Sequence, residues 1–352
     1  MIDEKLRSFL KERAIYLEKQ RVKAIRYNHL FKIVKPLRKI LKFVLILLVI
    51  INLIIPILIP LTITVGVVYL LLWFVNDPKE VFESTLKEDV LPSLFKHINE
   101  TYNYSAYGYN QNSLQNSEIL SKGHFINTVE IEGEDYVSGI IENIEVEFFE
   151  IKFYKEKINY VKTAGGCLLA LVLLPIFIIK SFFDDDNQLD EVFDGPVKDI
   201  NVFFSGFFMF ADFHKEFNGK IMMIPKNKDR IKDKFNELLE PKNLTKITVE
   251  NSYINDNYNI YASNIQTGYY VLSQNLIDKI HTLAEKEKTL PIISFINGKM
   301  YFIIPWNKNF FKVNLFQKIE DENYFLTYIQ EINEFEKIVK DLNLDTRIWS
   351  KV

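Results

Sequence analysis

Two charged residues stand within apolar runs, and they are the positions where the sequence offers most scope for chemistry. Asp212 follows the run Phe207–Ala211, and Arg347 lies between Leu344 and Ile348. A charge in such surroundings must be paired or reach water, because burying it alone is costly. We therefore predict a structural ion pair of Asp212 with Arg347 or with a lysine. The functional alternative is a carboxylate that faces a ligand pocket.

The other chemistry-bearing residues do not form a recognisable catalytic or metal-binding set. The five histidines are dispersed, and no two have the i, i+3 or i+4 spacing of a helical metal pair. The sequence has no glycine-rich phosphate loop and no nucleophile elbow. The acidic stretch Phe182–Pro196 lacks the alternating ligands of a calcium loop, which favours a solvated loop. No catalytic residue, cofactor or metal is predicted.

A long apolar stretch must determine where any such residues are placed. The 33 residues from Phe43 to Val75 carry no charged side chain. As one straight helix they would measure about 50 Å, well beyond a hydrocarbon core of about 30 Å. Pro56 and Pro60 lie near the middle and disfavour helix at the residues before them. We predict a transmembrane helical hairpin over 41–75, with passes at 41–55 and 57–75 and a bend at these prolines.

The charge distribution orients this hairpin. Residues 1–42 hold 13 Lys or Arg against 4 Asp or Glu, although the whole chain has a net charge of −3. A basic arm beside a membrane segment predicts a cytosolic N-terminus, and an even number of passes returns the C-terminus there. Residues 1–40 are expected to form a basic cytosolic helix, which either lies on membrane lipids or a partner or is a solvated lead-in to the membrane. Nucleic-acid binding is the less favoured explanation of its charge. The single cysteine, Cys167, excludes an intramolecular disulfide.

A second apolar segment complicates this picture. Residues 163–179 carry no charge and include Pro175, but about 17 helical residues are at the lower limit for a membrane pass. A third pass would separate the flanking strands across the membrane. We therefore expect a re-entrant or interfacial helix in preference to a buried one, within an apolar and acidic insertion over 163–196.

The rest of the chain, 76–352, predicts a cytosolic α+β domain with a mostly antiparallel sheet and flanking helices. Asn297-Gly298 joins two apolar runs as a type I′ hairpin turn would. Residues 320–342 have the periodicity of a closing helix. Residues 99–117 are expected to be an irregular loop, 123–154 to form three strands with turns at Gly133 and Asn143, and 269–272 to form a strand.

Three segments resemble a known family. Phe204–Lys220 resembles the F-x-G-L-F-F-x-A-D-F-x-K-x-F-x-G-x signature, and residues 342–351 resemble the closing L-N-L-N-T-R-I-W-T-K, of a bacterial membrane-protein family catalogued as domain of unknown function 3137. Glu134–Gly139 resembles its E-D-x-x-x-G strand. The positions that match the two longer signatures are Gly206, Phe207, Phe208, Asp212, Phe213, Lys215, Gly219, Asn343, Thr346, Arg347 and Trp349.

The resemblance implies a cytosol-facing domain on a hairpin in the bacterial inner membrane, and it brings no established activity. It also implies a LemA-type membrane protein as a partner, since the genes of the two families are often neighbours. We expect a non-enzymatic scaffold or membrane-surface interaction module. The alternatives are a lipid-handling module that uses residues 163–179, and a hydrolase or ligand sensor with a pocket near Asp212.

Overall fold

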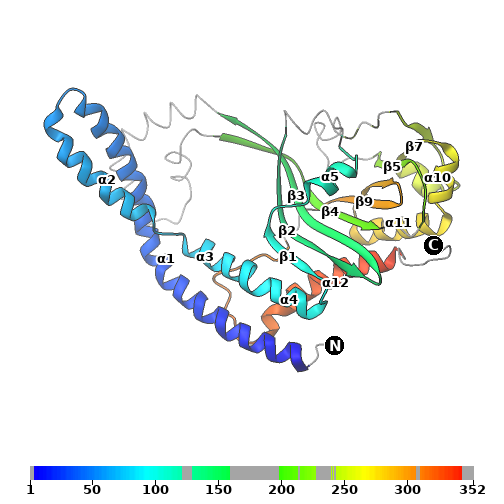
Figure 1. Cartoon of the computed structure of the whole chain (residues 1–352), viewed down its shortest axis with the longest axis horizontal. Coiled ribbons are helices and arrows are strands. Elements are labelled where there is room, and N and C mark those ends of the chain that lie inside the picture. Colours follow the sequence, from blue (N-terminus) through cyan, green and yellow to red (C-terminus); the bar gives the residue numbers. More distant parts are fainter. Residues whose placement is uncertain are drawn as a thin grey trace.

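The computed structural model describes residues 4–120, 129–158, 198–212, 215–226, 243–306 and 310–342, together with 239 and 241. The fold is α+β, with a large antiparallel sheet and flanking helices, as predicted (Figure 1). Residues 163–196, including the predicted apolar insertion, lie outside the described residues.

The described part of the chain forms one nine-stranded sheet in the order β1-β2-β3-β4-β9-β8-β5-β7-β6, with every neighbouring pair antiparallel. The strands are β1 Asn103–Tyr107, β2 Glu130–Ile141, β3 Ile144–Ile158, β4 Lys198–Asp212, β5 Lys220–Pro225, β6 Thr245–Ile247, β7 Tyr258–Ala262, β8 Ile292–Ile296 and β9 Lys299–Pro305.

The helices of the domain precede, connect or follow these strands in the chain. They are α3 Pro78–Ser84, the π-helical turn η2 Thr85–Val90, α4 Leu91–Ile98, α5 Gln111–Asn116, α9 Ser252–Asn257, α10 Ile265–Val271, α11 Gln274–Glu287, the 3-10 turn η4 Glu322–Phe325 and α12 Leu326–Asp341. The helical periodicity of residues 320–342 is thereby confirmed, since η4 and α12 occupy this segment.

The central strand β4 contributes to a core on each face of the sheet. Phe207 and Met209 belong to the larger core, which α12 covers, and Phe208 and Phe210 belong to the smaller one. Phe207 stacks on Phe335 of α12 with ring centroids 4.5 Å apart. Because side chains alternate between the faces, covering both faces requires the unbroken apolar run that β4 shows.

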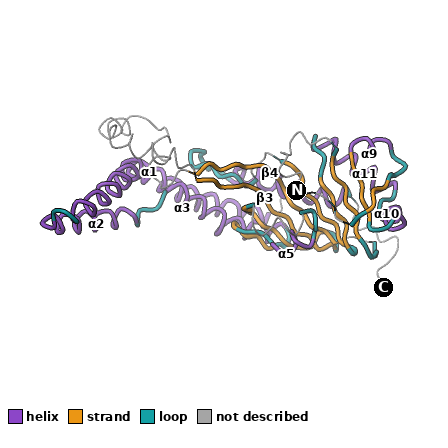
Figure 2. Tube along the Cα trace, turned by 90° about the horizontal axis from the view of Figure 1, so that it is seen from above, coloured by secondary structure: helices purple, strands orange, loops and turns teal. Residues whose placement is uncertain are grey.

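Two long helices extend away from the sheet at one end of the molecule (Figures 1 and 2). Helix α1, Glu4–Asn52, leads through the 3-10 turn η1, Pro56–Leu58, into α2, Ile59–Trp73. The helices are antiparallel neighbours: Asn52 Nδ2 donates to Thr62 Oγ1 at 2.5 Å, and Leu45 packs beside Gly66. By length and composition, one described helical run, Pro56–Ile98, could cross a membrane, and no residue of its most apolar window is buried.

The N-terminal half of α1 is part of the domain itself. Leu10, Ala14 and Leu17 are buried in the larger core. Glu18 accepts the backbone N–H of Ile319 at 3.0 Å, and Arg21 donates to the Leu315 carbonyl at 3.3 Å. The helix continues past Pro36 without a break, so one element joins the domain to the apolar hairpin.

Several local predictions were wrong. Residues 99–117 contain β1 and α5 instead of an irregular loop, and the described part of 123–154 contains β2 and most of β3, with the predicted turn at Asn143 between them, instead of three strands. Gly133 lies inside β2, where a Cβ atom would collide with the Tyr109 ring, so this glycine provides space for a neighbour and does not make a turn.

The segment 269–272 was expected to be a strand but mostly belongs to α10. The side chain of Asn264 accepts the Thr267 N–H at 2.7 Å and caps this helix. The Asn297-Gly298 hairpin is confirmed, because both residues have positive φ, 46° and 77°, between β8 and β9.

Candidate functional site

A buried ion pair connects the segment that follows the hairpin to the sheet. Lys87 of η2 and Asp135 of β2 are each 2% exposed, and Lys87 Nζ lies 3.0 Å from Asp135 Oδ2. The hydroxyl of Tyr104 in β1 donates to the other carboxylate oxygen at 2.5 Å. The Asp135 carboxylate thus has a partner on each of its oxygens, which offsets the cost of its burial.

Irregular backbone places both members of this pair. Asp135 has φ of 54°, in the left-handed region, and the β2–β3 register shifts between Glu134 and Val137. This bulge interrupts the alternation of side chains and directs Asp135 into the interior. Lys87 lies in a single π-helical turn, another irregularity that is frequent at functional sites.

Further carboxylates surround Lys87. Glu134 lies 3.6 Å and Glu83 lies 3.8 Å from its ammonium group. Lys152 of β3 pairs with Glu134 at 3.2 Å on the more exposed side of the cluster. Burial lowers the pKa of Lys87, but Asp135, Glu134 and Glu83 together raise it above its ordinary value. Lys87 is therefore a cation at neutral pH.

Two buried carboxyl groups, Asp135 in this cluster and Glu150 of β3, have raised pKa values. Burial raises the pKa of Asp135 to about 6 although Lys87 and Tyr104 lower it. Burial raises the pKa of Glu150 to about 7, with the Phe310 N–H bond opposing and Asp135 adding to the rise. Perturbed carboxyl groups also occur in structural networks, and here each is engaged by other parts of the fold.

Three of the predicted family-signature residues make close contacts or hydrogen bonds within the sheet and its turns. Gly206 faces the Ile304 carbonyl and the Phe204 ring so closely that a Cβ atom would collide with both. Lys215 donates to the Tyr270 carbonyl at 2.8 Å, and Gly219, with φ of 128°, donates to Asn297 Oδ1 at 3.0 Å. These residues hold the sheet and its turns together.

The predicted ion pair of Asp212 is only half described. Asp212 is the last residue of β4, half-buried and opposite Lys299 of β9. Its predicted partner Arg347 lies outside the described residues, as do Phe213, Asn343, Thr346 and Trp349. The pairing stays a prediction. Among the described residues, no group of three or more His, Cys, Asp or Glu side chains could hold a metal ion.

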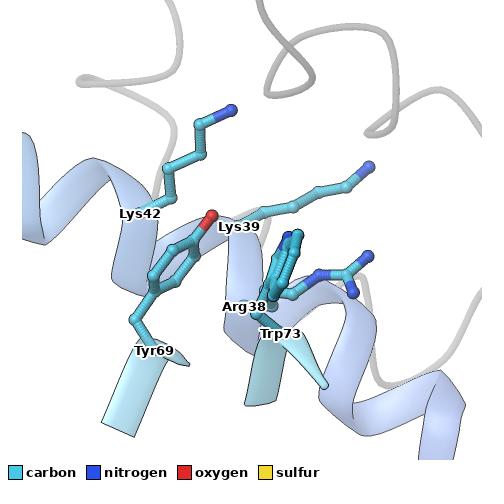
Figure 3. A pocket seen from close by; sticks show the side chains of 5 residues that line it. All are labelled: Arg38, Lys39, Lys42, Tyr69 and Trp73. Carbon is cyan, nitrogen blue, oxygen red and sulfur yellow. The ribbon is translucent and has the colours of Figure 1, made fainter. Parts of the chain in front are cut away.

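The base of the hairpin carries a second candidate site, which we call the basic collar: Arg38, Lys39 and Lys42 of α1 with Tyr69 and Trp73 of α2. These five residues line an open cavity of about 180 Å³. Figure 3 shows their side chains projecting into one space beside the two helices. Pro56 begins η1 and Pro60 lies in the first turn of α2, at the opposite end of the hairpin.

The sequence indicated each of the two sites only in part. Glu134 and Asp135 were part of the E-D-x-x-x-G resemblance, but nothing in the alternation of β2 indicated that Asp135 points inward or that Lys87 is its partner. The excess of basic residues in 1–42 indicated the cations of the collar. That Tyr69 and Trp73 face these cations became visible only in the pairing of α1 with α2.

Comparison with known proteins confirms the family resemblance. Residues 202–344 match the model of the family described as "Protein of unknown function (DUF3137)". No curated protein matches the sequence. A solved structure, the crystal structure of the mycobacterial trehalose monomycolate transport factor A, TtfA, is similar with a TM-score of 0.30 and 8% identity over 68% of this chain and 88% of that one. Similarity at that level carries no argument about this protein.

Proposed function

We propose that this chain, whose residues 202–344 fall within the DUF3137 family, is a membrane-anchored, non-enzymatic protein. In this proposal the α1–α2 hairpin lies in the bilayer and presents the sheet domain to a protein partner or to the membrane surface. The observation that supports it most is the uncovered apolar surface of α2, which has no buried residue although its side chains are almost all apolar. Apolar surface of this extent is covered by lipid or by protein in a stable molecule.

The connection between hairpin and domain supports a fixed presentation. Helix α1 enters the core through its N-terminal half, and the chain that leaves α2 is tied to the sheet by Lys87 and Asp135. Both arms of the hairpin are therefore fastened to the same domain. Such a double attachment would hold the sheet at one orientation to the membrane, which suits a scaffold.

The orientation follows from charge. The excess of Lys and Arg in residues 1–42 supports a topology in which the base of the hairpin, and with it both chain ends, lies on the cytosolic side of a bacterial inner membrane. A LemA-type membrane protein as partner follows from the family resemblance alone and stays a prediction.

The alternative functions have no support from the described residues. The lipid-handling module depends on residues 163–179, which lie outside them. The hydrolase or sensor depends on Asp212, which ends a strand opposite Lys299. Neither observation favours chemistry over packing, so we retain the anchored scaffold.

Alkaline carbonate extraction of membranes from cells that express the full chain tests the anchor. We expect the protein to stay in the pellet. A variant with Ile63→Lys, Val67→Lys and Leu71→Lys, all at exposed positions of α2, should move to the supernatant. Circular dichroism of that variant shows whether its domain is still folded. Complete extraction of the unaltered protein would contradict the proposal.

A further inference from the structure

We propose that the basic collar binds the phosphate of an anionic phospholipid headgroup in the leaflet that the hairpin enters. This inference rests on the proposed membrane anchor. The collar is where the last charged residues of α1 meet the facing aromatic residues of α2, and the described residues that line it include three cations. A cavity of that composition fits an oxyanion.

The spacing of the five residues makes them converge. Arg38 and Lys42 are four residues apart on α1, and Tyr69 and Trp73 are four apart on α2, so each pair lies on one face of its helix. Because the helices run antiparallel, the two faces meet at the same level (Figure 3). Lys39 adds a third cation from the buried side.

The chemistry of the lining matches an interfacial phosphate. The Arg38 guanidinium suits phosphate oxygens through paired N–H donors, and lysine adds a point charge. Tyrosine and tryptophan prefer the headgroup level of a bilayer, where a polar edge meets water and the ring meets acyl chains. Beyond the collar, most side chains of α1 and α2 are apolar and many are exposed, which would accommodate the acyl chains of the same lipid.

Native mass spectrometry of the full chain in neutral detergent tests this site. The probes are phosphatidylglycerol, phosphatidylcholine and inorganic phosphate. We expect retained phosphatidylglycerol at higher occupancy than phosphatidylcholine. Replacing Arg38, Lys39 and Lys42 by Gln should lower the apparent phosphatidylglycerol affinity at least about tenfold, since each cation near an anionic lipid contributes roughly 1 kcal/mol. The matched control, Lys19→Gln with Lys23→Gln and Arg26→Gln, removes the same charge from exposed positions of α1 and should leave the affinity unchanged.

Three outcomes overturn the inference. Equal phosphatidylglycerol binding by the collar variant and the unaltered chain removes the site. An equal loss of phosphatidylglycerol affinity in the control variant would show that overall charge, and not the collar, determines binding. Displacement of the lipid by millimolar inorganic phosphate makes free phosphate the ligand and overturns the lipid as its source. Carbonate extraction of the same collar variant separates this failure from failure of the anchor, because a variant that remains in the membrane pellet leaves the anchor intact.

The hairpin turn carries a second inference independently: we infer that the turn stays in the hydrocarbon and does not emerge on the far side. From Lys42 to Asn52, α1 rises about 15 Å, and the turn adds roughly one helical pitch of about 5 Å. A hydrocarbon core is about 30 Å thick. A hairpin whose collar lies at one interface is therefore too short to reach the other.

The composition and bonding of the turn agree with burial in lipid. Residues 53–61 have no polar side chain, and Leu53 and Ile57 are each 83% exposed. The N–H groups of Leu53, Ile54, Ile55, Leu58 and Ile59 donate to backbone carbonyls within the turn or the end of α1. Pro56 and Pro60 have no N–H to satisfy. Backbone in hydrocarbon must meet its hydrogen bonds internally, and this turn largely does so.

A single cysteine at the turn distinguishes the two topologies. In a Cys167→Ala background, Ile55→Cys should resist a membrane-impermeant maleimide in spheroplasts and in inverted vesicles, and react only in detergent. Reaction in spheroplasts would show a complete crossing and overturn this inference while leaving the anchor intact. Reaction in inverted vesicles would show that the hairpin lies outside the membrane and would overturn the anchor as well.

Discussion

Lys87 and Asp135 form an ion pair 3.0 Å long in the interior of the protein, between the chain that leaves the hairpin and a bulge in the sheet. A buried pair of this kind is weak evidence for stability, because desolvation consumes most of the attraction. It is stronger evidence for a specified geometry, since only one arrangement satisfies both charges. We infer that the pair sets how the hairpin attaches to the domain.

Removing one member of the pair should destabilise the domain strongly. Lys87→Met retains the length of the side chain but leaves the Asp135 carboxylate without its cation, and we expect a loss of about 3–5 kcal/mol in the free energy of unfolding. The double variant Lys87→Met with Asp135→Asn should lose markedly less. Denaturant unfolding of the full chain in detergent measures both. A loss in the double variant equal to the sum of the losses in Lys87→Met alone and Asp135→Asn alone would show that the two residues do not act as a pair.

Glu150 should make stability fall with rising pH. Its folded pKa of about 7 lies above the ordinary 4.5, so between these pH values the folded protein holds a proton that the unfolded chain has lost. The contribution is complete below about pH 4.5 and disappears as pH rises through about 7; it amounts to on the order of 3 kcal/mol.

Glu150→Gln tests this dependence, because glutamine still accepts the Phe310 N–H but cannot ionise. We expect the variant to be more stable than the unaltered chain at pH 8 and to show a shallower decline between about pH 4.5 and 7. Chemical unfolding at a series of pH values provides the measurement. Parallel pH profiles for the two proteins would assign the decline to other groups.

Gly206 should not tolerate a side chain. A Cβ atom there would meet the Ile304 carbonyl and the Phe204 ring, so Gly206→Ala must separate β4 from β9, at a cost of about 1–3 kcal/mol. Gly66→Ala is the matched control, since its Cβ atom would make an ordinary contact with Leu45, 3.6 Å away. The midpoint temperature of thermal unfolding should be lower in Gly206→Ala than in the unaltered chain and nearly unchanged in Gly66→Ala.

The extent to which the sequence predicted the structure depended on whether the deciding forces were local. The Asn297-Gly298 turn and the helix α12 follow from short-range backbone preferences and periodicity, and both were predicted. Gly133 was misread because its role is to leave space for the Tyr109 ring from the connection between β1 and α5. Asp135 was missed for the same reason: a bulge directs it inward toward Lys87, which is 48 residues away in sequence.

Labelling one position on each side of the hairpin shows whether the hairpin anchors the chain with both flanking segments in the cytosol. In the Cys167→Ala background, Lys19→Cys lies in α1 before the hairpin and Asn275→Cys lies in α11 after it, both at exposed positions. An impermeant maleimide applied to spheroplasts should label neither residue, and applied to inverted membrane vesicles it should label both. Labelling of exactly one of the two from outside would place the chain ends on opposite sides and contradict the anchored-hairpin account.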